Sequence, residues 1–235
     1  MKIGGLLKFS IIDFPGKLAA VVFTQGCNLR CPYCHNAELV LPEKYQPPIP
    51  LRTIFDFLKK RQGQLNGVVI SGGEPTVHQD LKPFLQKVKD LDYAIKLDTN
   101  GTHPEVISDI IHSGLVDYIS MDIKAPLSKY HQVTGIPHQE ELIKHSIRLL
   151  LERHVPYEFR STVPKDLLKE NDIQEMSALI KGATQYHLQR FVPRLSVIDP
   201  VYADEQMDNY SEADMQHLRK KYDITDSSIE EPRKN

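Results

Sequence analysis

The chain has three cysteines, and all of them lie within eight residues: Cys27, Cys31 and Cys34. This C-x3-C-x2-C run can bind a four-iron cluster through three of its irons, because each iron takes one terminal sulfur ligand. The fourth iron then has no protein ligand and is open to another molecule. An open coordination position is typical of a catalytic metal site, so the run predicts an iron–sulfur cluster that takes part in a reaction.

Other uses of the three thiols fit their number and spacing less well. A disulfide would leave one thiol over. A zinc ion needs a fourth ligand, and His35 follows Cys34 so closely that its side chain could not easily turn back to the same ion. An electron-transfer ferredoxin would bring a fourth cysteine, and this chain has only three. A non-catalytic module that binds a structural ion remains the alternative from another class of protein.

The composition is that of a soluble globular protein. The 235 residues suffice for one domain with a sizeable core, and 40% of them are hydrophobic and 26% charged. A net charge of −2 gives no electrostatic basis for binding nucleic acid or an anionic membrane. We recognise no signal peptide and no membrane-spanning run. We therefore expect a cytoplasmic protein, in a reducing compartment that suits free thiols.

Short apolar runs rich in β-branched residues alternate with longer helical patterns. The six runs lie at 18–24, 67–71, 94–98, 118–124, 158–163 and 187–192. The helical patterns lie at 52–62, 80–91, 104–113, 138–153 and 171–181. Thr53, with Asp56 three residues later, is expected to cap the first helix. This order predicts an α/β fold in which helices cover a parallel sheet.

Six β/α units are fewer than the eight that close a full barrel. We therefore expect a partial, open (β/α)6 TIM-like barrel over residues 1–200, with a gap wide enough to admit something large. Residues 201–235 are expected to add a short helix capped at Ser211 and a mobile charged tail.

Polar groups gather at the ends of the predicted strands. They are the cysteine loop, Ser71-Gly72-Gly73-Glu74, Asp98-Thr99-Asn100-Gly101, Asp122 with Lys124, and Arg160 within the fifth strand. The carboxyl ends of parallel strands converge on one face, where α/β barrels hold their active sites. Several chemically different groups on one rim therefore predict a functional site.

Each of these groups also has a structural explanation. Gly72 and Gly73 could form an ordinary strand-to-helix turn, although backbone without side chains also lets a ligand approach closely. Asp98 and Asp122 could cap loops, or they could share a monovalent cation or bind an ammonium group. Arg160 could pair with a surface acid at little energetic consequence.

The cysteine run, with Tyr33 before its last cysteine, resembles the signature of radical S-adenosylmethionine enzymes. The stretch Gly72-Gly73-Glu74-Pro75 is similar to the motif with which that superfamily binds the methionine amino group. Within the superfamily the chain most resembles the activating enzymes of glycyl-radical enzymes. The resemblance covers roughly residues 1–195 and runs through Ser10-x2-Asp13-x-Pro15-Gly16, Gln25-Gly26-Cys27, Cys34-His35-Asn36, Asp98-Thr99-Asn100-Gly101 and Met121-Asp122-Ile123-Lys124. Among these enzymes it is most similar to the activating proteins of anaerobic ribonucleoside-triphosphate reductases, of which the opening from Ile3-Gly4-Gly5-Leu6 to Cys34-His35-Asn36 is typical.

This resemblance implies two cofactors. A [4Fe-4S] cluster would be held by Cys27, Cys31 and Cys34, and S-adenosylmethionine would bind the open iron. The reduced cluster would cleave S-adenosylmethionine to methionine and a 5′-deoxyadenosyl radical. The protein would supply binding, orientation and the exclusion of water.

The resemblance also assigns contacts to individual residues. Those matching cofactor-contacting positions are Tyr33 against the adenine, the backbone of Ser71, Gly72 and Gly73 at the methionine ammonium, Glu74 as polar support, and Asp122, Lys124 and Arg160 at the active face. Those matching a monovalent-cation site beside the cofactor are Asp98, the backbone of Thr99 and Ser120, and Asp122.

The implied substrate is a glycine in the backbone of a glycyl-radical enzyme, and the implied electron donor is a protein such as flavodoxin or ferredoxin. Leu195 stands where related activases of pyruvate formate-lyase carry a histidine, which argues against a formate-lyase partner. A small-molecule radical enzyme of similar size, such as a deazapurine synthase, is the alternative within the superfamily.

Overall fold

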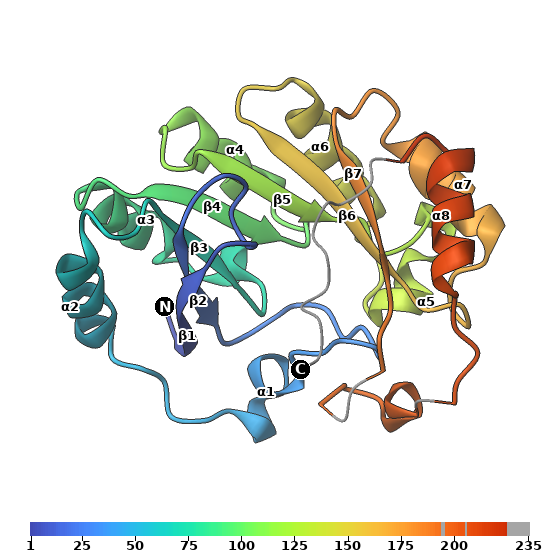
Figure 1. Ribbon diagram of the computed structural model, residues 1–235, viewed down its shortest axis with the longest axis horizontal. Helices are drawn as coiled ribbons and strands as arrows, with labels where there is room; N and C mark the ends of the chain where they lie inside the picture. Colours follow the sequence, from blue (N-terminus) through green and yellow to red (C-terminus); the bar gives the residue numbers. More distant parts are fainter. Residues whose placement is uncertain (194–195, 205, 225–235) are drawn as a thin grey trace.

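The computed structural model describes residues 1–193, 196–204 and 206–224, and its centre is a sheet of seven strands ordered as they occur in the chain (Figure 1). The strands are β1 (Ile3–Ser10), β2 (Ala19–Thr24), β3 (Gly67–Gly72), β4 (Ala94–Thr99), β5 (Tyr118–Asp122), β6 (Tyr157–Val163) and β7 (Tyr186–Arg190). Strands β2 to β7 are parallel, and in the described part of the chain β7 does not pair with β1. The predicted open barrel of six parallel strands is thereby confirmed.

The strand that the sequence did not predict is β1, which pairs antiparallel with β2. Its sequence contains Gly4, Gly5 and Lys8, residue types that are depleted in strands, so no apolar run is visible. Gly4 is closely packed, because a Cβ atom there would displace the side chains of Leu39 and Gln25. The extra strand extends the sheet at one edge and leaves it open.

The five helices predicted at 52–62, 80–91, 104–113, 138–153 and 171–181 are present within two residues of their expected bounds, and the short helix predicted after Ser211 is also present. The helices are α1 (Ala37–Val40), α2 (Leu51–Arg61), α3 (Leu81–Lys89), α4 (Pro104–His112), α5 (Tyr130–Thr134), α6 (Glu140–Leu151), α7 (Glu170–Leu179) and α8 (Glu212–Lys221). In the described residues, α1 and α5 occur in addition to those predicted. The predicted cap at Thr53 is wrong, because α2 already begins at Leu51, after Pro50. Ser211 does cap α8: its Oγ accepts the Asp214 N–H at 3.1 Å.

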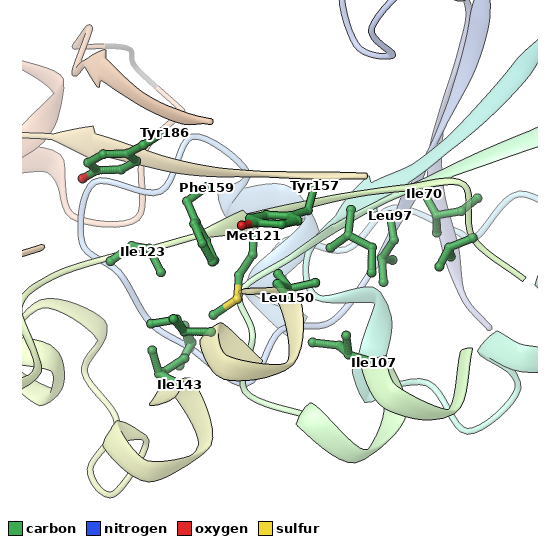
Figure 2. Close-up of a cluster of buried hydrophobic side chains, with 14 of the residues drawn as sticks. Ile70, Leu97, Ile107, Met121, Ile123, Ile143, Leu150, Tyr157, Phe159 and Tyr186 are labelled. Carbon is green, nitrogen blue, oxygen red and sulfur yellow. The ribbon is translucent and has the colours of Figure 1, made fainter. Parts of the chain in front are cut away.

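The main core lies between the outer face of the sheet and the helices. Figure 2 shows Leu97, Met121 and Phe159 pointing from the strands toward Ile107 of α4 and Leu150 of α6. All of these side chains are buried. Burying one such side chain stabilises the fold by about 1.5–3 kcal/mol, so this layer holds the strands in register.

Strand alternation sends the remaining side chains to the inner face of the sheet. On β4, Lys96 and Asp98 alternate with the core residue Leu97, and on β6 Glu158 alternates with Phe159. A small apolar cluster closes the amino-terminal end of this face and consists of Phe14, Ala19, Val21, Val69 and Tyr118. The polar side chains therefore lie above it, toward the carboxyl ends of the strands.

The chain continues beyond β7 to α8, whose Met215 and Leu218 are buried in the main core. Arg219 also donates hydrogen bonds to the Leu188 carbonyl of β7. The expected charged tail at 225–235 and Leu195 lie outside the described residues. No helix in the described ranges is long and apolar enough to span a membrane.

Candidate functional site

The cysteine loop follows β2 and is held in place by backbone hydrogen bonds. The Arg30 N–H donates to the carbonyl of Thr134 at 2.7 Å, and the Gly26 N–H donates to Leu39 at 2.7 Å. The Arg30 guanidinium also closes the loop on itself, because Nη1 donates to the Cys27 carbonyl at 2.8 Å. These contacts fix the loop at the carboxyl end of the sheet, as the sequence predicted.

The glycine-rich loop after β3 packs directly on the cysteine loop. The Glu74 N–H donates to the Gly26 carbonyl at 2.7 Å, and the Gly73 N–H donates to the Thr24 carbonyl at 2.9 Å. A Cβ atom at Gly73 would overlap the Gly26 carbonyl, and Gly72 has a φ of +109° with Thr24 backbone in the way of a side chain. Only glycine fits at these two positions, and their backbone faces the same space as the cysteines.

Glu74 holds this arrangement together from inside the protein. Its Oε1 accepts hydrogen bonds from Thr76 N–H and Oγ1, at 3.1 and 2.5 Å, and from Thr99 Oγ1 at 2.7 Å. Its Oε2 accepts the Asn100 N–H at 2.6 Å. Burial raises the pKa of Glu74, while these hydrogen bonds act to lower it. The carboxylate therefore ties the glycine loop to the end of β4.

The loops and strand ends enclose one cavity of about 210 Å³. A single water needs only about 10–15 Å³, so the cavity suits a ligand much larger than an ion. The predicted residues that line it are Cys27, Cys31, Tyr33, Cys34, Ser71, Gly72, Gly73, Glu74, Asp98, Thr99, Asp122, Lys124 and Arg160. Ser120 is not among them. It is fully buried beneath the cavity, where its Oγ donates to Glu158 at 2.7 Å.

Asp122 is the centre of a charged cluster on the cavity wall. Lys124 Nζ lies 2.8 Å from Oδ2, and Arg160 Nε lies 3.2 Å from Oδ1. Burial alone would raise the pKa of Asp122, but the two positive charges outweigh it and lower the pKa. Arg160 also reaches Asp98, with Nη2 at 3.7 Å from Oδ2. The carboxylate of Asp122 is thus ionised and held in one orientation.

The three cysteines supply the sulfur donors that an iron–sulfur cluster requires. Burial is the main cause of their raised pKa, to about 11 at Cys27 and about 12 at Cys31, and it also raises the pKa of Cys34. Without metal the thiols keep their protons at neutral pH. Thiolates are the metal ligands, so cluster binding here must release protons. Three sulfurs on one cavity wall, with no fourth cysteine in the chain, fit a cluster with one open iron.

Aromatic residues pack between the cysteine loop and the segment that follows β7. Tyr33 is buried and packs edge-on against Phe191 and Tyr202, with ring centroids 6.0 and 6.4 Å apart. His35 stacks on Phe191 at 5.2 Å, and its Nε2 lies 2.8 Å from the Val192 carbonyl. His35 therefore links the cysteine loop to the segment after β7.

Two charged residues on the inner face were not predicted, Lys96 and Glu158. Lys96 Nζ lies 2.9 Å from Asp98 Oδ1 and 3.6 Å from Glu158 Oε1. The sequence does contain a pattern that could have predicted them. In each case a charged residue inside an apolar strand stands two positions before another charged residue. Side chains two apart in a strand share a face, so Lys96 accompanies Asp98, and Glu158 accompanies Arg160.

The comparison with protein families agrees with this geometry. The model of the radical SAM superfamily matches residues 21–180, and the chain belongs to that superfamily. It is therefore an enzyme of this class, which uses a [4Fe-4S] cluster and S-adenosylmethionine. The alternative of a non-catalytic metal-binding module is thereby wrong.

Individual relatives show which members of the superfamily the chain resembles. A Methanocaldococcus jannaschii protein named as a candidate glycyl-radical enzyme activating enzyme is 35% identical over 200 residues, which are 82% of this chain and 80% of that protein. The 7-carboxy-7-deazaguanine synthase of Thermococcus kodakarensis is 27% identical over 187 residues, or 71% of this chain and 72% of the synthase. Among solved structures, Streptococcus suis SuiB bound to S-adenosylmethionine has a TM-score of 0.63 at 16% identity, over 86% of this chain and 45% of SuiB. This last likeness concerns the fold.

Proposed function

We propose that the protein is an activating enzyme that removes a hydrogen atom from a backbone glycine of a glycyl-radical enzyme. The observation that carries this proposal is the 35% identity to the Methanocaldococcus jannaschii relative, which extends over four fifths of both chains. The motifs of the amino-terminal third favour anaerobic ribonucleoside-triphosphate reductase as the partner.

The reaction divides between the cofactors and the protein. When bound, the cluster supplies the electron that cleaves S-adenosylmethionine, and the resulting 5′-deoxyadenosyl radical takes a hydrogen atom from the substrate to give 5′-deoxyadenosine and a substrate radical. Cys27, Cys31 and Cys34 would hold the cluster. The chain's other residues bind and orient S-adenosylmethionine and keep water away.

The cavity wall offers groups that could bind each polar part of S-adenosylmethionine and its adenine. The backbone of Ser71 to Gly73, with no side chain in the way at the two glycines, would receive the methionine ammonium. Asp122 is already ionised and fixed, so it can accept hydrogen bonds from the cofactor without reorganisation. Lys124 would contact the carboxylate or the ribose, and Tyr33 would lie against the adenine.

The open sheet supports a protein substrate. The gap between β1 and β7 leaves one side of the inner face uncovered by strands in the described part of the molecule (Figure 1). A loop of a folded partner could reach the cavity through this side. Releasing and ordering such a loop costs free energy, so we expect weak or slow association with the partner. The electron would come from a small redox protein such as flavodoxin or ferredoxin.

The test is to form the glycyl radical directly. The cluster-loaded protein, S-adenosylmethionine, a reductant and the candidate reductase are mixed without oxygen. We expect a doublet electron-paramagnetic-resonance signal from a glycyl radical. When the reductase carries glycine deuterated at its α-carbon, deuterium should move into 5′-deoxyadenosine. A Cys31→Ala protein, processed in the same way, should give neither result.

A small-molecule substrate is the second candidate, because the Thermococcus kodakarensis synthase matches over about 70% of both chains. In that case 5′-deoxyadenosine would form without deuterium whichever glycyl-radical enzyme is supplied. A deazapurine precursor would instead raise 5′-deoxyadenosine production above the background rate.

A further inference from the structure

Lys96 is a lysine whose ammonium lies inside the protein. Its side chain is only 3% exposed, in the middle of β4. Nζ lies 2.9 Å from Asp98 Oδ1 and 3.6 Å from Glu158 Oε1, so it lies between two carboxylates from different strands. Fully buried lysines are rare, because removing an ammonium from water costs more than packing an apolar side chain of the same size. A role other than packing therefore has to explain Lys96.

The surroundings of Lys96 require a positive charge at this place. Glu158 accepts hydrogen bonds from Ser120 Oγ at 2.7 Å and Tyr118 Oη at 3.3 Å, and His187 Nε2 lies 3.4 Å from it. Burial alone would raise the pKa of Glu158, but the contact with His187, the nearby charges of Lys96 and Arg160 and the hydrogen bond from Ser120 together lower it to about 2. The carboxylate therefore stays ionised and needs a cation nearby.

Asp98 presents both oxygens to positive groups of the chain. Oδ1 faces Lys96 at 2.9 Å, and Oδ2 faces Arg160 at 3.7 Å. Asp98 was the main predicted ligand of a monovalent cation. Each oxygen therefore has a cationic neighbour from the chain, although Oδ1 meets Lys96 as an ion pair and without hydrogen-bond geometry.

The charges of this inner-face cluster are balanced within the chain. Its three carboxylates are those of Asp98, Asp122 and Glu158, and its three cationic side chains are those of Lys96, Lys124 and Arg160. S-adenosylmethionine brings an ammonium, a carboxylate and a sulfonium, a net charge of +1. A potassium ion beside Asp98 would lie close to the Lys96 ammonium and the Arg160 guanidinium, and repulsion between these like charges disfavours its binding.

On the basis of the proposed function, we propose that Lys96 is a positioning residue whose ammonium takes the place of the monovalent cation expected beside Asp98. It fixes the Asp98 carboxylate and completes the charge balance beneath the S-adenosylmethionine site. S-adenosylmethionine binding by this protein then requires no added cation.

The first test compares cations on the natural chain. The affinity of the cluster-loaded protein for S-adenosylmethionine is measured by equilibrium dialysis, without oxygen, in potassium chloride and in tetramethylammonium chloride, whose cation is too large for a site of this kind. We expect the two dissociation constants to agree within about twofold. An affinity that potassium raises fivefold or more would overturn the proposal.

The second test asks whether a potassium ion from solution can replace the Lys96 ammonium. Lys96→Met removes the charge at nearly constant shape, so Asp98 becomes free to bind a small cation. We expect its affinity for S-adenosylmethionine to fall about tenfold or more in tetramethylammonium, as for the loss of a charge-assisted contact, and potassium to restore much of it. Potassium should also raise the thermal unfolding midpoint of this variant and leave that of the natural chain unchanged. Lys96→Arg should behave as the natural chain does.

The matched control is Lys82→Met, which removes an ion pair of similar length, 2.6 Å to Asp109, from an exposed position. It should respond to neither cation. A folded Lys96→Met protein that ignores potassium would contradict the proposal, and if that variant does not fold, the natural chain and Lys96→Arg decide. These measurements use binding and unfolding alone, so they stand apart from the assay for a glycyl radical, whose failure would count against the proposed function only.

Discussion

The carboxylate of Glu74 should be a structural requirement of the site, and its replacement by glutamine tests this. All four hydrogen bonds that reach Glu74 come from donors: the Thr76 N–H and Oγ1, Thr99 Oγ1 and the Asn100 N–H. A carboxylate can accept all four. In Glu74→Gln one acceptor oxygen becomes an NH2 group, which must face a donor whichever way the amide is turned.

The expected loss of stability in Glu74→Gln has two sources, the hydrogen bond that is lost and the buried donor that is left without a partner. A hydrogen bond to a charged group contributes about 1.5–3 kcal/mol, and a buried donor without a partner costs about 1–3 kcal/mol. Part of this is offset, because the variant no longer buries a charge. We expect the free energy of unfolding to fall by about 3 kcal/mol, which for a chain of this size lowers the unfolding midpoint by about 6–12 °C.

The assay is thermal and urea unfolding of the cluster-free protein, followed by circular dichroism. The control is Glu43→Gln, at an exposed position, which should change stability by less than about 0.5 kcal/mol. Because Glu74 ties the glycine loop to β4, Glu74→Gln should also weaken S-adenosylmethionine binding in the cluster-loaded protein. A variant as stable as the natural chain would show that the hydrogen bonds to Glu74 do not hold the loop.

Three further outcomes are expected. Replacing Cys27, Cys31 or Cys34 by alanine should abolish S-adenosylmethionine cleavage and most iron binding, because no other thiol can substitute, as iron analysis and a 5′-deoxyadenosine assay would show. Asp122→Ala should weaken S-adenosylmethionine binding by about tenfold or more at unchanged iron content, since one charge-assisted contact contributes about 1.5–3 kcal/mol. The pKa of Glu158 is lowered from 4.5 to about 2, so Glu158 stabilises the fold above pH 4.5 by about 3 kcal/mol and loses this effect as the pH falls toward 2. In urea titrations of cluster-free protein, Glu158→Gln should lack this part of the pH dependence, and an unchanged pH profile would contradict it.

The sequence predicted the parts of the site that depend on local order. Apolar runs such as 67–71 are bounded by glycines or charges, so the strand ends could be found, and parallel strands bring such ends together. The sequence therefore predicts that the cysteine loop, the glycine loop and Asp122 lie on one rim of the sheet, and in the structure they line one cavity.

The sequence could not predict features that depend on which strand lies beside which. Ser120 faces Glu158 because β5 and β6 pair in that register, and the sequence of neither strand predicts the contact. The hydrogen bonds of Glu74 were not predicted for the same reason, since its partners Thr99 and Asn100 belong to the end of another strand. The strand β1 was missed because Gly4 and Gly5 serve close packing and conceal the strand pattern.

The two faces of the sheet have different functions: the outer face stabilises the fold, and the inner face carries the charges near the ligand site. The outer face carries side chains such as Leu97 and Phe159, whose truncation would cost about 2–5 kcal/mol in stability. The inner face carries charges such as Asp98 and Glu158, which apolar side chains of the same size could replace at little loss of stability, provided that their partners were replaced together. The inner face is therefore explained by ligand binding rather than by folding. Changes confined to it should alter which cofactor atoms are held, and in what charge environment, while the strands keep their positions.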